Sequence, residues 1–224
     1  MGDQMWNTYQ LELVVDKLTG GLPKHPEIVR RWQEAKWPTG GDAVTGKTIE
    51  QATAETIDLI GEPNEEVSGI WTGFVSARFE EPGIQFACIE ARIIKAMLKE
   101  AANIVKNLTL LRDPKTGKTP GYLRSKVAER VFVSPRLIRV CEEDKVKSAE
   151  RPIHVMTMRG PRTALKRVDY VEDVPLSCTL RVLNDKVITE KVLRVMLDYA
   201  QDGGLGTDRS IGSGTFTYKL TSLT

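Results

Sequence analysis

The side chains best suited to proton transfer in this sequence are its two histidines, His25 and His154. Histidine changes charge near neutral pH and can act as a general acid or base. His25 lies between two prolines in GGLPKHP, and Tyr9, Lys24 and Tyr122 are the side chains that could assist it. A loop histidine without a chemical role explains the same position and is the favoured interpretation. His154 lies in IHVMTM, where the spacing predicts a strand and a packing or sheet-edge role.

The sequence also matches the phosphate-binding loop pattern G-x-x-x-x-G-K-[ST], with GDAVTGKT from Gly41 to Thr48. In such a loop, backbone amides and a lysine bind the phosphates, and a buried strand must precede it. Here the preceding QEAKWPTG is polar and includes Pro38, the region is acidic, and no apolar strand ending in Asp follows to hold magnesium. We therefore expect no ATP hydrolysis from this segment.

The three cysteines form neither a metal-binding nor a disulfide pattern. Cys88, Cys141 and Cys178 are odd in number and widely spaced, and each lies in or beside an apolar stretch. No Cys, His or carboxylate cluster has ligand spacing, so we expect no metal and no cofactor. No window approaches the roughly 18 apolar residues of a membrane span, and MGDQMWNTYQ lacks the features of an export signal. These features predict a cytoplasmic protein that contacts no membrane.

The charge of the chain is unevenly distributed, although its net value is only +2. Residues 1–91 carry 7 Lys and Arg against 15 Asp and Glu, whereas residues 92–170 carry 19 against 8 and residues 171–224 carry 6 against 7. Clustered positive charge is typical of proteins that bind a nucleic-acid backbone. An ordinary solvated surface is the alternative explanation.

Two segments of this basic middle third are the expected phosphate-binding elements. A helix at Ile89–Lys106 has apolar residues at the spacing of one face and most of its cations on the other. A loop at residues 159–167, RGPRTALKR, gathers further cations near Tyr170, an aromatic that could stack a base. A solubilising turn explains that composition equally well. The cations expected to contact phosphate are Lys95, Lys99, Arg159, Arg162, Lys166 and Arg167.

The most distinctive motif is GGLGTDRSIGSGTF at residues 203–216. Gly204, Gly206, Gly212 and Gly214 form two G-x-G pairs separated by five residues. Glycine permits positive φ and close backbone approach, consecutive amides can bind an anion, and Arg209 could add a charged contact to phosphate. A helix cap followed by a bulged strand explains about two of the four glycines. We therefore expect the loop to bind phosphate as well.

The stretch GLGTDRSIGSG at residues 204–214 resembles the glycine-rich loop of the RAMP proteins, the RNA-binding subunits and RNA endonucleases of CRISPR systems. A second segment, Ala87–Ala102, is similar to the basic helix of backbone-type RAMP subunits, although Ile-Glu-Ala at 89–91 replaces their Pro-Gly-Ser turn. The resemblance implies a ferredoxin-like fold and binding of guide RNA. It also gives His25 a candidate role, because RNA-cleaving RAMP proteins commonly carry a catalytic histidine just after the first strand.

The elements that must position these residues follow from periodicity and turn residues. Strands are expected at Tyr9–Leu18, Ile70–Phe79, Arg130–Val133, Leu137–Cys141, Ile153–Met158, Leu176–Leu183 and Gly214–Leu220, and the clearest helices at Ile49–Ile60, Ile89–Lys106 and Thr189–Ala200. This order fits an α+β, ferredoxin-like (RRM-like) βαββαβ sheet. We expect one domain over residues 1–224, with an acidic insertion at 38–68 and basic ones at 107–130 and 141–171.

Together these features favour a non-catalytic, RNA-binding, RAMP-like subunit that holds guide or repeat RNA by its phosphate backbone. Its expected partners are RNA and either further copies of itself or other effector subunits of an antiviral ribonucleoprotein. Two alternatives remain open at this point. One is a metal-independent RNA endonuclease that uses His25 as general acid or base. The other is a viral or structural assembly protein that has this fold and binds no RNA.

Overall fold

A computed structural model describes most of the chain between residue 74 and the C-terminus, and the first strand. The residues described are 5–20, 30, 34, 48–51, 54, 74–79, 84–112, 117, 119–157 and 160–223. The chain divides into two compact units, of which the first comprises residues 1–19, 88–141 and 171–224. The second comprises residues 20–87 and 142–170, and it contains most of the segments that we expected to be insertions.

The first unit has the strand order of a ferredoxin-like sheet. Its chain order is β1 (Trp6–Thr19), α3 (Ala91–Val105), β4 (Val131–Ser134), β7 (Gly160–Leu183), α5 (Glu190–Gly203) and β8 (Phe216–Ser222), with β7 entering from the second unit. The strands lie side by side in the order β4-β7-β1-β8. This is a βαββαβ arrangement in which the last strand lies beside the first, and it confirms the predicted α+β fold.

All neighbouring strands of this sheet are antiparallel. β1 pairs with β8, with Leu13 opposite Tyr218, and β4 pairs with β7. Between β1 and β7, Trp6 contacts Arg181 while Gln10 bonds to Ser177, so residue numbers rise along one strand as they fall along the other. The sheet therefore has no parallel pair and needs helical crossovers only between non-adjacent strands.

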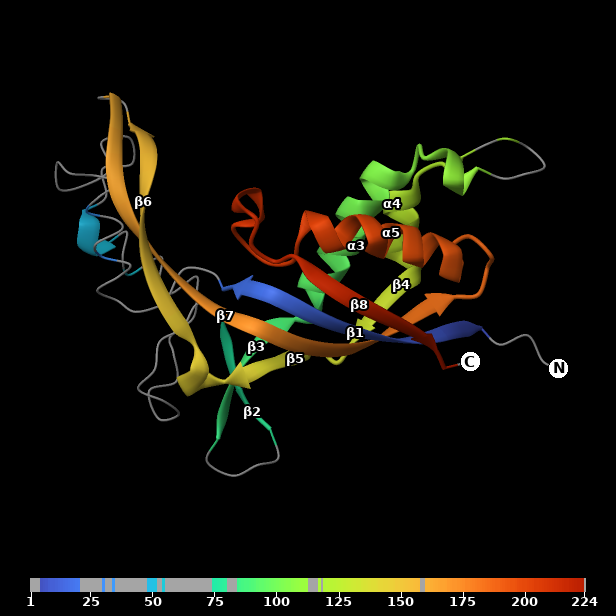
Figure 1. Cartoon of the computed structure of the whole chain (residues 1–224), viewed down its shortest axis with the longest axis horizontal. Coiled ribbons are helices and arrows are strands. Elements are labelled where there is room, and N and C mark those ends of the chain that lie inside the picture. Colours follow the sequence, from blue (N-terminus) through green and yellow to red (C-terminus); the bar gives the residue numbers. More distant parts are fainter. Residues whose placement is uncertain are drawn as a thin grey trace. The chain divides into compact units, whose positions relative to one another are not determined.

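The core of this unit lies between one face of the sheet and helices α3 and α5, which Figure 1 shows on the same side. Burial in β1 alternates with a period of two, as expected for a strand with one covered face. The helices contribute residues at i, i+3 and i+4 spacing. Fully buried members of this core are Leu11, Leu13, Ile94, Leu98, Leu180, Leu193 and Met196.

Helix α4 (Leu123–Arg130) was not predicted from the sequence, which we interpreted there as loop and insertion. Its apolar side is only Leu123 and Val127, one helical turn apart and both buried. Two apolar residues give too short a periodic signal to distinguish a helix from a loop. α4 packs directly against α3, and this contact supplies the helix stability that the local sequence does not.

The second unit contains part of a three-stranded sheet and a long hairpin. The sheet has the order β2 (Val75–Arg78), β3 (Gln85–Glu90) and β5 (Leu137–Glu142), and β3 and β5 continue into the first unit. The hairpin joins β6 (Lys147–Thr157) to the first part of β7, with Lys147 opposite Tyr170. The expected loop at 159–167 is therefore wrong for residues 160–167, which are strand.

Candidate nucleic-acid interface

The glycine-rich loop connects α5 to β8, and the four glycines of its two G-x-G pairs have positive φ. Thr189 caps α5 by accepting a hydrogen bond from the Val192 amide, and the helix ends at Gly203. Beyond it φ is +78° at Gly204 and +86° at Gly206, Gly212 and Gly214. These are left-handed values that side-chain-bearing residues rarely adopt, so each glycine has a conformational reason to be there.

Three of the four glycines are also required by close packing within the first unit. A Cβ on Gly204 would lie 2.7 Å from the Ser213 carbonyl oxygen, and one on Gly206 would lie 3.1 Å from that of Thr19. A Cβ on Gly214 would lie 2.6 Å from the Leu205 amide nitrogen and closer still to its carbonyl oxygen. Only at Gly212 would a Cβ meet nothing within 4 Å. Open space for another molecule's backbone is therefore found at Gly212 alone among these four.

Hydrogen bonds fasten this loop to the end of β1. The Leu205 amide donates to the Gly214 carbonyl and the Gly214 amide to that of Lys17, each at 2.8 Å. The buried Thr19 hydroxyl donates to the Thr207 carbonyl. The loop is thus packed against the end of the sheet. Its exposed residues are Thr207 and residues 210–212, which include the end of the short turn η3 (Arg209–Ile211).

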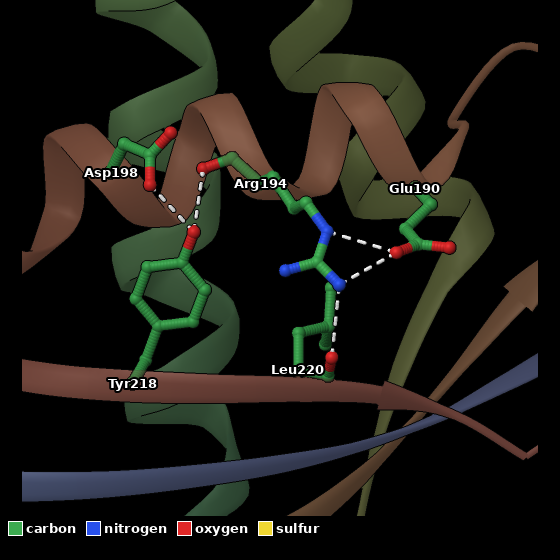
Figure 2. Close-up of polar contacts among 5 residues, drawn as sticks. All are labelled: Glu190, Arg194, Asp198, Tyr218 and Leu220. Carbon is green, nitrogen blue, oxygen red and sulfur yellow. Dashed lines mark hydrogen bonds and ion pairs between the residues drawn. The ribbon is translucent and has the colours of Figure 1, made fainter.

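A polar network holds together the two elements that enter and leave the loop (Figure 2). Tyr218 of β8 donates from its hydroxyl to Asp198 of α5 at 2.6 Å, and Arg194 donates twice to Glu190, at 2.7 and 2.9 Å. Arg194 also donates to the Leu220 carbonyl at 3.0 Å. Burial, and then the Asp198 carboxylate, raise the pKa of Tyr218 to about 12, so the phenol is neutral at physiological pH.

Arg209, predicted to contact phosphate, is paired with a carboxylate of α3. Its Nη1 lies 2.8 Å from Oε2 of Glu100, and both side chains are partly exposed. The loop therefore reaches α3 through an ion pair. A phosphate would have to compete with Glu100 for this guanidinium.

Lys95 lies on a different side of α3 from the glycine loop. Its ammonium is 4.9 Å from the ring centroid of Phe132 in β4, and it is five residues from Glu100, which is about 140° around the helix axis. Partial burial, and then the neighbouring charge of Lys99, lower the pKa of Lys95. Lys95 and the glycine loop therefore do not line a single groove on α3.

The cations of the second basic segment lie along the hairpin. Arg162 and Lys166 are in β7, opposite Val155 and Arg151 of β6, and Arg159 lies outside the described residues. Arg167 has its Nε 3.6 Å from the carboxylate of Asp169, which is buried, and its Nη2 donates to the Ser148 hydroxyl at 3.0 Å. At 3.6 Å the contact is an ion pair rather than a hydrogen bond, which agrees with the lack of a hydrogen-bond partner for that Nε. Arg167 therefore has a structural role.

The acid–base candidates do not come together among the described residues. His25 and Lys24 lie outside them, as does the phosphate-loop match except for Thr48. Tyr9 is a core residue whose pKa is raised by burial and then by Glu190, whereas Tyr122 is exposed. His154 is in β6, as the predicted strand implied.

Cysteine and acidic clusters also give no site in the part of the chain that the structure describes. No group of His, Cys, Asp and Glu there could hold a metal ion. None of the three cysteines forms a disulfide, and burial raises the pKa of Cys178 to about 12. Within the same residues, no helix is both long and apolar enough to cross a membrane.

The sequence did not predict an aromatic and cationic cluster on the uncovered face of the sheet. The rings of Trp6 and Phe132 meet edge to face with centroids 5.5 Å apart, and the guanidinium of Arg181 lies 4.7 Å from the Trp6 centroid. With Lys95 over Phe132, the cluster joins β1, β4, β7 and α3. Its members are far apart in sequence, so no local pattern could have indicated it.

Comparison with known proteins gives structural neighbours only. No protein-family model and no curated protein matches the chain. A chain of the solved "Cryo-EM structure of the Type III-B Cmr-beta bound to cognate target RNA" is similar with a TM-score of 0.45 and 9% identity, over 97% of this chain and 61% of that one. This chain thus spans about three fifths of that neighbour's length. A chain of a "Type IV-B CRISPR Complex" is similar with a TM-score of 0.39 and 10% identity, over 96% and 90%. Both scores are low, so the fold assignment rests on the strand order described above.

Proposed function

We propose that this chain is a non-catalytic, RNA-binding, RAMP-class subunit of a CRISPR ribonucleoprotein. In this role it holds guide or repeat RNA mainly by the phosphate backbone and contacts further copies of itself or other effector subunits. It acts in the cytoplasm, in defence against foreign nucleic acid, and it needs no cofactor.

The observation that carries this proposal is the coincidence of a motif with a position in the fold. GLGTDRSIGSG resembles the RAMP glycine loop in sequence, and residues 204–214 occupy the connection between the second helix and the last strand of a βαββαβ sheet. The sequence pattern was recognised independently of the strand order. Because glycines at these positions are demanded by φ and by packing, the motif supports membership of the fold class more directly than it supports phosphate binding.

The positive charge of the middle third is the second observation that supports the proposal. The middle third carries 19 Lys and Arg against 8 Asp and Glu, and the counterion release that accompanies phosphate binding favours such a segment. Among the predicted phosphate-binding cations whose side chains the structure describes, Arg209 and Arg167 already have carboxylate partners, which leaves Lys95 and Lys99 as the better candidates. Their mutual repulsion and the partial burial of Lys95 are costs that a nearby phosphate would offset.

The test is the affinity of a labelled single-stranded 20-nucleotide RNA, measured by fluorescence anisotropy at several salt concentrations. Lys95→Gln with Lys99→Gln should weaken binding and reduce the magnitude of the salt slope by roughly 0.7 for each lost phosphate contact. The matched control is Lys186→Gln with Lys191→Gln, two exposed lysines outside the basic third. Equal behaviour of the two double variants would contradict the proposed placement of the RNA.

The same RNA separates the two alternatives. It should stay intact when incubated with the protein in EDTA, and cleavage that is lost in His25→Ala would replace the proposal with a metal-independent endonuclease. Absence of any RNA binding by the wild-type chain, and of nuclease-sensitive nucleic acid in the purified protein, would favour an assembly protein.

A further inference from the structure

The uncovered face of the ferredoxin-like sheet carries one concentrated group of aromatic and cationic side chains. Phe132 and Arg181 are directly opposite each other in the β4–β7 register, and their neighbours Val131 and Val182 are buried under the helices. Trp6 has the same parity in β1 as Glu12 and Val14, which are exposed. Trp6, Phe132 and Arg181 therefore lie across three neighbouring strands on the face opposite α3 and α5.

Lys95 extends this cluster from the helix layer. β4 is the edge strand of the sheet and α3 packs beside it, which lets the Lys95 ammonium lie over the Phe132 ring. We refer to Trp6, Lys95, Phe132 and Arg181 as the aromatic–cation cluster. It remains open to solvent, since Phe132 is 46% exposed and Arg181 is exposed.

The charge of the aromatic–cation cluster is not balanced by carboxylates. Elsewhere in the described part of the chain, Arg130, Arg167, Arg194 and Arg209 each lie within 4 Å of an Asp or Glu oxygen. Within the described part of the chain, no such carboxylate partner is found for Lys95 or Arg181. Each of these two cations instead lies over the face of an aromatic ring. A cation on a ring face is stabilised by the ring quadrupole but keeps its full charge. The cluster thus offers two positive charges and two rings to one ligand.

A ligand with a flat ring and a neighbouring negative charge matches this arrangement. A nucleotide has both, in its base and its phosphate. A base can stack on an exposed aromatic whatever its sequence, while cations on either side bind the flanking phosphates. We infer that the aromatic–cation cluster stacks one nucleobase of single-stranded RNA on Phe132, which Trp6 meets edge to face, with Arg181 and Lys95 binding the adjacent phosphates. This inference rests on the proposed RNA binding and adds a base-contacting site to it.

The rest of the uncovered face does not compete for this role. Farther along the sheet, Glu12 and Asp16 place carboxylates there, and Lys219 lies 3.8 Å from Glu12. Gln10 donates to the Ser177 hydroxyl at 2.6 Å, so its amide is already engaged. The strand end that carries the cluster is therefore the electropositive end of the face for the described residues.

Two fluorescein-labelled probes test the inference: a single-stranded 20-nucleotide RNA and an abasic ribose-phosphate strand of equal length. The wild type should bind the base-bearing strand more tightly. Phe132→Ala should weaken binding of that strand roughly 5- to 100-fold, with little effect on the abasic strand or on the salt slope. Phe132→Tyr should keep the preference for the base-bearing strand, because it keeps an aromatic ring at this position. Arg181→Gln should instead weaken both probes and reduce the salt slope.

Val14→Ala is the matched control, since it removes an exposed apolar side chain from the same face of β1 and should change neither affinity. Circular dichroism checks that each variant is folded, and Phe132→Leu, which removes the ring but keeps an apolar side chain, keeps the test decisive if Phe132→Ala does not fold. If the wild type binds RNA but a folded Phe132→Ala or Phe132→Leu variant binds both probes like wild type, the stacking site is refuted and the proposed function stands. If the wild type binds neither probe, the proposed function fails and this inference fails with it.

Discussion

At the scale of single residues, the glycine loop offers a matched pair in which φ is the same and steric overlap differs. Gly212 and Gly214 both have φ of +86°, but a Cβ meets nothing at the first and backbone atoms of Leu205 at the second. Gly212→Ala should cost about 1 kcal/mol of unfolding free energy, the strain of a left-handed alanine. Gly214→Ala should cost about 3 kcal/mol or more, because Leu205 must also move. Urea unfolding followed by circular dichroism measures both, and equal costs would show that packing at Gly214 is unimportant.

Tyr218 gives a prediction about pH. Its pKa is raised from 10.0 to about 12, so the folded state favours the protonated phenol, and the stability from this preference is complete below pH 10 and is lost as pH rises towards 12. Tyr218→Phe removes the hydrogen bond to Asp198 and should cost about 1 kcal/mol at pH 8. The difference in unfolding free energy between wild type and variant should shrink above pH 10. A difference that stays constant from pH 8 to 11 would mean that the phenol ionises as freely folded as unfolded.

At the scale of elements, the hairpin of β6 and β7 contains an ion pair between Arg167 and Asp169. Loss of this ion pair would destabilise the hairpin, and an RNA-binding assay would record that change as weaker binding. Arg167→Ala leaves the buried Asp169 without its cation, at a cost of about 1–2 kcal/mol once the partial exposure of Arg167 is considered. Asp169→Asn in the same chain should recover part of that loss, because a neutral amide needs no cation. Thermal unfolding of the two single variants and the double variant forms the cycle. Strict additivity would show that the two side chains are not coupled.

Most elements with a periodic apolar pattern or several β-branched residues could be predicted from sequence, whereas the first part of β7, which is stabilised by pairing with β6, could not. β1, α3, α5 and β8 repeat their apolar residues at a strand or helix period, which packing on one face requires. Residues 160–167 have no such period, so the composition of RGPRTALKR predicted a loop. Pairing with β6 makes residues 160–167 a strand instead. At the candidate site, positive charge was visible in the sequence, but the partners of the charges were not. Arg209 and Glu100 are 109 positions apart, and the aromatic–cation cluster joins residues 6, 95, 132 and 181.

At the scale of the whole molecule, the hairpin can be removed without cutting the part of β7, from Val171 to Leu183, that belongs to the first unit. Lys147 is directly opposite Tyr170, so deleting residues 148–169 and joining the ends through Asn-Gly makes a two-residue turn between strands already in register. The deletion removes Arg167 and Asp169 together, and therefore leaves no buried carboxylate unpaired. The shortened chain should keep the far-ultraviolet circular dichroism of a folded α+β protein.

RNA binding by this shortened chain tests how far the basic hairpin contributes to the proposed function. The deletion removes five Lys and Arg, at positions 151, 159, 162, 166 and 167. If all five contact phosphates, the magnitude of the salt slope falls by about 3.5, and the loss of affinity is greatest at low salt, because counterion release is largest there. The preference for a base-bearing over an abasic strand should survive, since Trp6, Phe132 and Arg181 lie outside the deleted residues. An unchanged salt slope in a folded shortened chain would restrict RNA binding to the first unit and show that the hairpin cations form a solvated surface.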